Sequence, residues 1–113
     1  FEKNYNSNET LEIAVSEVAQ QMNHQAVVFL DVRNFDESPK IAFKNSIQIP
    51  LNQLESELYK LNKEASIFVF CQSGVRSKIA AEFLRNNDFK KVRTVIGGAI
   101  AIEKLNQETV SVC

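Results

Sequence analysis

Two short and almost uninterrupted runs of apolar residues constrain the fold of this chain more than any other feature. They are AVVFLDV at 26–32 and SIFVF at 66–70, and both are rich in Val, Ile and Phe. Runs of this length are typical of strands that are buried on both faces, as in a parallel sheet. Two weaker strand patterns, ended by a proline and by a glycine pair respectively, cover 46–50 and 92–96.

Helical patterns lie between these strands, at residues 15–22, 52–61 and 77–87. Asn52 followed by Glu55 predicts a capping box at the start of the second helix. Strands that alternate with helices of about ten residues predict right-handed parallel crossovers. We therefore expect an α/β domain with helices on both faces of the sheet, and a surface loop over the polar segment 34–45.

The length and the formal charge of the chain limit the number of domains and the kinds of partner that we expect. The chain has 113 residues, enough for one domain, which we assign to 9–106, with 1–8 as a linker and 107–113 as a tail. Fourteen acidic and thirteen basic residues leave a formal charge of -1, which disfavours nucleic acid or an anionic membrane as a partner. No apolar stretch approaches the ~18 residues of a membrane span. We expect a cytoplasmic protein, and the polar start without methionine favours a domain from a longer polypeptide.

Cysteine and histidine are scarce. Cys71 and Cys113 are the only cysteines, and His24 is the only histidine. These distant residues form no zinc pattern, and a cysteine at the end of the chain argues against a disulfide framework. A cysteine–histidine catalytic pair is disfavoured, because His24 falls in a predicted polar turn. We therefore expect no metal, no cofactor and a reduced thiol, and we assign no role to Cys113.

The segment CQSGVRS, residues 71–77, joins a predicted strand to a predicted helix. The first turn of a helix has unsatisfied N–H groups and a partial positive charge, and Gly74 gives the loop the freedom to aim further N–H groups at one centre. Such a site stabilises an anion, and the first anion available is the thiolate of Cys71. Arg76 adds a fixed charge and a planar fork suited to an oxyanion. The segment therefore predicts a nucleophile that is active at neutral pH without histidine.

The same segment resembles the active-site loop of the rhodanese family, which runs Cys, two residues, Gly, one residue, Arg, and Ser or Thr. Three further motifs agree in order and spacing, and together they span about residues 9–105: FLDVRN, SIQIPL and VIGGAIAI. The chain departs from the family's common pattern at Ala42, where many relatives have histidine, and at Ile102, where an aromatic residue is common. Neither position performs the transfer, although both affect the rim of the pocket.

This resemblance implies a rhodanese-like three-layer α/β/α sandwich with a mostly parallel, five-stranded sheet. It also implies that the thiol of Cys71 accepts a sulfane sulfur, becomes a persulfide, and passes the sulfur to an acceptor. Arg76 would contact the anionic group of the donor and Ser77 would fix the loop, while Asp31 and Arg33 would brace it from a neighbouring strand. The outer sulfur would be cradled by the backbone N–H groups of Gln72, Ser73, Gly74, Val75 and Arg76.

Several alternatives remain at this stage. A cysteine phosphatase or arsenate reductase uses a similar loop, but with five residues between cysteine and arginine, whereas this chain has four. A rhodanese-like domain used only for binding or regulation would not need Cys71 and Arg76, which this chain keeps. A buried structural cysteine in an unrelated α/β domain would leave the other motifs unexplained.

The partners follow from the sulfurtransferase interpretation. The donor would be thiosulfate or a persulfide, and a sulfur-carrier protein or a cysteine desulfurase would be a protein partner. The chain would be either a free-standing enzyme or the sulfur-relay domain of a fusion with an adenylating enzyme of molybdopterin or thiolated-tRNA synthesis. The positive segment from Lys78 to Arg93 predicts a docking surface for an acidic carrier.

Overall fold

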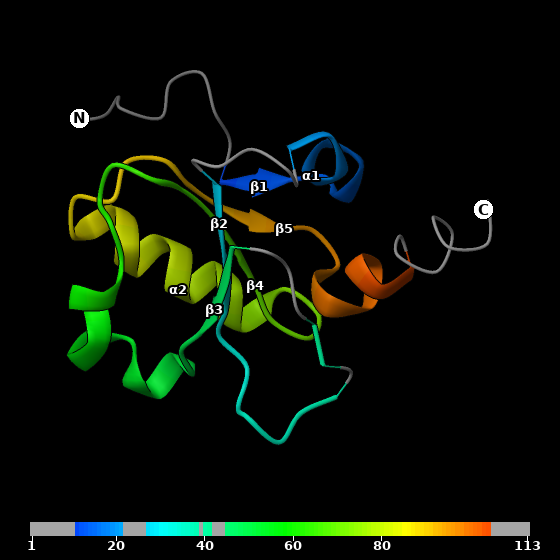
Figure 1. The fold of residues 1–113 in the computed structure, drawn as a ribbon, viewed down its shortest axis with the longest axis horizontal. Coiled ribbons are helices and arrows are strands. Elements are labelled where there is room, and N and C mark those ends of the chain that lie inside the picture. The colour runs from blue at the N-terminus through cyan, green and yellow to red at the C-terminus, as the bar shows by residue number, and fades with distance from the viewer. Residues whose placement is uncertain (1–10, 22–26, 39, 42–44, 105–113) are drawn as a thin grey trace.

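The computed structural model describes residues 11–21, 27–38, 40–41 and 45–104, and Figure 1 shows them as one sheet with flanking helices. The five strands are β1 (Glu12–Ile13), β2 (Val27–Asp31), β3 (Ser46–Gln48), β4 (Ser66–Phe70) and β5 (Val92–Val95). The helices are α1 (Val15–Gln21), α2 (Val75–Asn86) and the 3₁₀ turns η1 (Leu51–Gln53) and η2 (Glu55–Lys60). Residues 98–104 are also helical.

The strands form one sheet in the order β1-β5-β4-β2-β3, and every pairing in it is parallel. This confirms the predicted parallel sheet and places β4 at its centre. All four strands predicted from their apolar patterns are present, although β2, β3 and β5 are shorter than predicted. The sequence pattern did not locate β1, because a strand of two residues is too short to show alternation.

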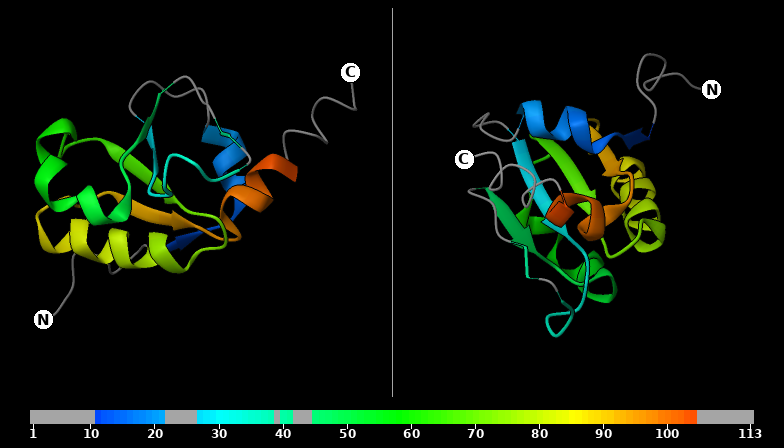
Figure 2. Two further views of the ribbon diagram at one scale, coloured as in Figure 1. Left: turned by 90° about the horizontal axis from the view of Figure 1, so that it is seen from below. Right: turned by 90° about the vertical axis from the view of Figure 1, so that its right-hand side faces the viewer.

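Alternate side chains of β4 enter two apolar clusters on opposite faces of the sheet. Ile67 and Val69 pack with the buried face of α2 and with Leu54 between the 3₁₀ turns. The other cluster joins aromatic side chains of the sheet to α1 and the helical residues 98–104, and its members include Val18, Phe29, Phe68, Phe70 and Ile102. Figure 2 shows α2 and α1 on either side of the strands. The predicted three-layer sandwich is therefore confirmed.

The helix predicted at 52–61 is wrong in type. The segment forms two 3₁₀ turns with a kink at Glu57, and its backbone bonds span three residues, as from Gln53 N–H to the Pro50 carbonyl at 2.8 Å. Pro50 precedes the first turn in an extended conformation, so Asn52 lies inside that turn and no side chain caps it. Leu54 is still buried, as the apolar spacing predicted.

The basic residues of the predicted docking surface, Lys78 to Arg93, are divided between the two ends of α2. Lys78 lies in the first turn of α2, next to the carboxyl ends of the strands, whereas Lys90 and Lys91 follow α2 and precede β5. The 12 residues of α2 separate the two ends by about 18 Å, at 1.5 Å per residue. Arg93, moreover, donates to the carbonyl of Glu12 at 2.6 Å. A partner bound at Lys90 and Lys91 would therefore lie at the opposite end of α2 from Cys71.

Candidate active site

Cys71 lies directly after β4, and the loop that it begins, residues 71–76, ends in the first turn of α2. We call this segment the Cys71 loop. Gly74 is the residue before α2 and has a φ of 121°, a conformation that L side chains rarely adopt. The sequence predicted this freedom at Gly74, and the positive φ confirms it. The geometry turns the loop back, so that its N–H groups and those of the helix start face the thiol.

The Sγ atom of Cys71 accepts hydrogen bonds from the N–H groups of Gly74, at 3.1 Å, and Ser77, at 3.3 Å. Burial raises the pKa of this thiol, but the Ser77 hydroxyl and the N–H groups of Ser77, Gly74 and Ser73 lower it more. The net pKa therefore lies below the ordinary value of a cysteine thiol. These donors stabilise the thiolate at the amino end of α2, as the sequence predicted for this loop.

The buried hydroxyls of Ser77 and Thr94 form a hydrogen bond next to this thiol. Ser77 Oγ lies 2.6 Å from Thr94 Oγ1 on β5, and it is 3.2 Å from the carbonyl oxygen of Gly74, to which it can donate. A hydroxyl has one proton to give. When Thr94 donates to Ser77, the Ser77 hydroxyl can donate its own proton to the Gly74 carbonyl or to the Cys71 thiolate. Thr94 thus belongs to the site, although no sequence motif indicated it.

The turn after β5 contacts the backbone of the Cys71 loop. The N–H of Ala99 donates to the carbonyl of Cys71 at 2.7 Å. Gly98 has a φ of 59°, and a Cβ atom at that position would lie 2.3 Å from the Cys71 carbonyl oxygen and 2.8 Å from that of Gln72. Only glycine leaves room for this approach. The glycine pair of the sequence therefore fixes one wall of the site, in addition to ending β5.

Asp31 and Arg33 form a buried ion pair at the end of β2. Nε and Nη2 of Arg33 donate to the Asp31 carboxylate at 3.0 Å, and both side chains are almost fully buried. Nη1 of Arg33 donates to Oε1 of Gln72 in the Cys71 loop at 3.0 Å. Gln48 of β3 donates to the Arg33 carbonyl at 3.1 Å. These contacts support the bracing role that the resemblance implied for Asp31 and Arg33.

Arg76 is paired with Glu37, an acidic residue of the polar segment 34–45. Its Nη1 and Nη2 atoms donate to the two carboxylate oxygens of Glu37, at 2.6 and 2.8 Å. The hydrogen bond from Arg76 and a second from the Asn34 N–H lower the pKa of Glu37 to about 2, and the same pairing raises the pKa of Arg76. The carboxylate occupies the guanidinium fork that, by the resemblance, would contact the anionic group of the donor. An arginine fork in a predicted active-site loop was the available signal for such a partner.

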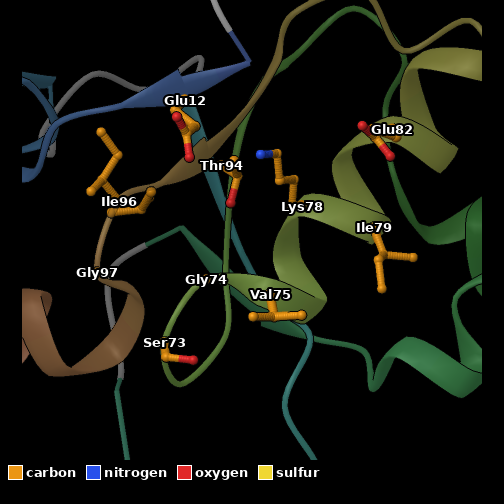
Figure 3. A pocket seen from close by; sticks show the side chains of 11 residues that line it. Glu12, Ser73, Gly74, Val75, Lys78, Ile79, Glu82, Thr94, Ile96 and Gly97 are labelled. Carbon is orange, nitrogen blue, oxygen red and sulfur yellow. The ribbon is translucent and has the colours of Figure 1, made fainter.

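A recess of about 420 Å³ adjoins the outer side of the Cys71 loop (Figure 3). Ser73 and Gly74 form its edge at the loop, and Lys78 extends into it from α2 toward β5. Its apolar lining comes from Val75, Ile79 and Ile96, which are largely exposed to solvent. Cys71 is not among the lining residues and is 1% exposed.

Within the described residues, Cys71 to Ser77 and the Asp31–Arg33 pair form one site at the carboxyl ends of β4 and β2. No group of three potential metal ligands occurs in that part of the chain. Likewise, none of its helices has the length and apolar character needed to cross a membrane. Ala42, His24 and Cys113 lie outside the described residues, and Ile102 packs in the core rather than at the rim.

Comparison with known proteins identifies the family and the fold. The family model for the rhodanese-like domain matches residues 14–104. The chain belongs to the rhodanese-like domain family. Among solved structures, a rhodanese-related protein from Thermoplasma volcanium superposes with a TM-score of 0.72 and 29% identity, over 84% of this chain and 93% of that one. The rhodanese-like sandwich expected from the resemblance is therefore confirmed.

Two curated relatives of this rhodanese-like domain act in sulfur or tRNA chemistry by their names. The "Putative sulfur carrier protein YrkF" of Bacillus subtilis (strain 168) is 32% identical over 94 residues, which are 82% of this chain and 51% of the relative. A tRNA uridine(34) hydroxylase of Cronobacter sakazakii (strain ATCC BAA-894) is 29% identical over 102 residues, 85% of this chain and 29% of the relative. The chain thus spans about half or less of the length of these relatives.

Proposed function

We propose that this rhodanese-like domain is a sulfurtransferase that carries sulfane sulfur as a persulfide on Cys71. The observation that carries the proposal is the position of Cys71 Sγ, which accepts hydrogen bonds from the N–H groups of Gly74 and Ser77 at the amino end of α2. Such a thiolate is a nucleophile at neutral pH. Membership of the family supports the same chemistry.

The transfer takes two displacements at sulfur. The Cys71 thiolate attacks the outer sulfur of the donor, a new S–S bond forms, and the old bond breaks with its electron pair on the leaving group, which is sulfite when the donor is thiosulfate. The new terminal sulfur carries the negative charge. An acceptor nucleophile then attacks that sulfur and releases the Cys71 thiolate. No net oxidation of the protein occurs, and the domain returns to its starting state.

The residues around the thiol would divide the work. The N–H groups of the loop, from Gln72 to Arg76, would hold the charge of the terminal sulfur, as those of Gly74 and Ser77 hold the thiolate before transfer. Ser77 would keep the start of α2 aimed at the sulfur. The loop is short, with four residues between Cys71 and Arg76, and such a ring suits one sulfur atom better than a phosphate group.

The proposal includes its partners. The donor would be thiosulfate or a persulfide, and a sulfur-carrier protein or a cysteine desulfurase would supply or receive the sulfur. The relative named as a sulfur carrier protein supports this class of partner. A cytoplasmic location belongs to the proposal as well, because a reducing compartment keeps the thiol available.

Mass spectrometry tests the proposal directly. We expect Cys71 to gain the mass of one sulfur atom on incubation with thiosulfate or glutathione persulfide, and cyanide to remove that sulfur as thiocyanate. The test uses a Cys113→Ser background, so that any adduct is assigned to Cys71, and Cys71→Ala in that background is the control. Absence of an adduct with every donor would exclude the transfer. Hydrolysis of a phosphate ester by the same protein would favour the phosphatase alternative instead.

A further inference from the structure

The pairing of Glu37 with Arg76 changes what the site can bind. Both terminal nitrogens of the Arg76 guanidinium donate to the two oxygens of one carboxylate, at 2.6 and 2.8 Å. This is a bidentate geometry, which leaves the outer fork of Arg76 occupied before any donor arrives. The site therefore offers its thiolate and its N–H groups, but the charge of its arginine is already balanced.

The turn that carries Glu37 holds the carboxylate in place. The N–H of Asn34 donates to Oε2 of Glu37 at 3.0 Å, and the N–H of Glu37 donates back to the Asn34 carbonyl at 3.2 Å. Gln48 donates to the Arg33 and Asn34 carbonyls, at 3.1 and 3.2 Å, which ties the start of this turn to β3. The carboxylate is thus positioned by its own turn, and it is ionised throughout the neutral range, since its pKa is about 2.

A donor with a strongly anionic group meets this carboxylate as a competitor. To reach Arg76, the sulfonate end of thiosulfate must displace Glu37 or lie beside it, and like charges at contact distance repel even at a half-exposed site. A donor whose charge is smaller, or lies only on the transferred sulfur, does not need the fork of Arg76. Its sulfur needs only the N–H groups that face Cys71.

We propose that Glu37 is a specificity-determining residue: it competes with the anionic group of the donor for Arg76, so that the site selects against doubly charged thiosulfate and in favour of donors of lower charge. The donor class that this selects is a monoanionic or thiol-borne persulfide. The inference rests on the proposed function for its biological meaning. The discrimination against anions at Cys71, on which the inference depends, can be measured without any sulfur transfer.

Alkylation of Cys71 by a matched pair of reagents measures this discrimination against anions. Iodoacetate and iodoacetamide react with the same thiolate by the same displacement, and they differ by one negative charge. The ratio of their rate constants therefore reports the electrostatic potential at Cys71. A change in the pKa of the thiol alters both rate constants by the same factor and cancels from the ratio. In a Cys113→Ser background, we expect Glu37→Gln to raise the iodoacetate to iodoacetamide ratio roughly tenfold, with a smaller gain at high salt.

The matched control is Asp36→Asn, which removes the same charge from the neighbouring residue of the turn. Asp36 is exposed, whereas the two terminal nitrogens of Arg76 donate to Glu37. We expect this variant to change the ratio less than about twofold, as for a screened surface charge. Glu37→Ala serves as a second variant, and the urea midpoint of each variant shows whether the fold is retained. Equal effects of Asp36→Asn and Glu37→Gln would mean that only the total charge matters, and would overturn the proposal.

Sulfur transfer from two donors then links the inference to function. Thiosulfate and methanethiosulfonate give the same Cys71 persulfide, but the first is a dianion and the second a monoanion. We expect Glu37→Gln to raise kcat/KM for thiosulfate about tenfold more than for methanethiosulfonate, mainly through KM. An unchanged iodoacetate to iodoacetamide ratio in folded Glu37→Gln would show that Glu37 does not affect anions at Cys71, and a lower ratio would show that it favours them; either result would refute the inference. A raised ratio in a protein that transfers no sulfur would instead refute the proposed function alone.

Discussion

Replacing Gly98 with alanine tests how closely the turn after β5 packs against the Cys71 loop. The new Cβ would lie 2.3 Å from the carbonyl oxygen of Cys71 and 2.8 Å from that of Gln72, whereas ordinary contact begins at 3.4 Å. Both neighbours are backbone atoms, so no side chain can rotate away. Either the loop or the helical residues 98–104 must move by about 1 Å, the difference between 3.4 and 2.3 Å.

The magnitude follows from three costs. A left-handed φ costs an alanine about 1–2 kcal/mol, and overpacking of a close contact adds about 1–3 kcal/mol. Separation of the two segments also strains the hydrogen bond from Ala99 to Cys71, which is 2.7 Å long and contributes about 1 kcal/mol. We therefore expect Gly98→Ala to lower the free energy of unfolding by about 4 kcal/mol, a large part of the 5–15 kcal/mol that is usual for a domain.

Urea unfolding followed by circular dichroism measures this loss. With a denaturant slope of about 2 kcal/mol/M, the midpoint of Gly98→Ala should fall by about 2 M. Ile100→Ala is the control on the same helical segment, because Ile100 is 55% exposed and its truncation should stay within about 0.5 kcal/mol. A loss below about 1 kcal/mol in Gly98→Ala would refute the close approach of this turn to the Cys71 carbonyl.

Two further predictions concern the groups around the thiol. Asp31→Asn leaves the buried charge of Arg33 without its carboxylate, so we expect the free energy of unfolding, measured with urea, to fall by about 3 kcal/mol. The double variant Asp31→Leu with Arg33→Met should lose less, because no buried charge is left unpaired. A loss below about 0.5 kcal/mol in Asp31→Asn, as at an exposed site, would contradict the burial of this pair. Ser77→Ala removes a hydroxyl that lowers the pKa of Cys71, so the midpoint of the pH profile for iodoacetamide alkylation should move to higher pH. A midpoint that stays or falls would show that the backbone N–H groups alone stabilise the thiolate.

The parts of the fold that depend on local pattern could be predicted from the sequence. The apolar run at 66–70 matches β4, and the need for a positive φ at Gly74 followed from the turn between a strand and a helix. The type of the helix at 52–61 could not be predicted, because an apolar spacing that buries Leu54 and Leu61 is satisfied by two 3₁₀ turns as well as by an α-helix.

The missing parts of the site are contacts between distant segments. Glu37 and Arg76 are 39 residues apart, and Ser77 and Thr94 are 17 apart. Neither pair leaves a periodic pattern, since each depends on how a loop or strand is placed by the sheet. The sequence could indicate that Arg76 needs an anionic partner, but several acidic residues were available. Only the fold of the turn at 34–37 selects Glu37.

The central place of β4 has a consequence for local opening. Among the described strands, β4 is paired on both sides, by β2 and β5, while the sheet ends on its two shortest strands, β1 and β3. Edge strands with few backbone bonds open first and exchange their amide hydrogens fastest, whereas a central strand exchanges only when the whole domain opens. The Cys71 loop follows directly after that central strand. Fraying at either edge of the sheet therefore leaves the thiolate and its N–H donors assembled.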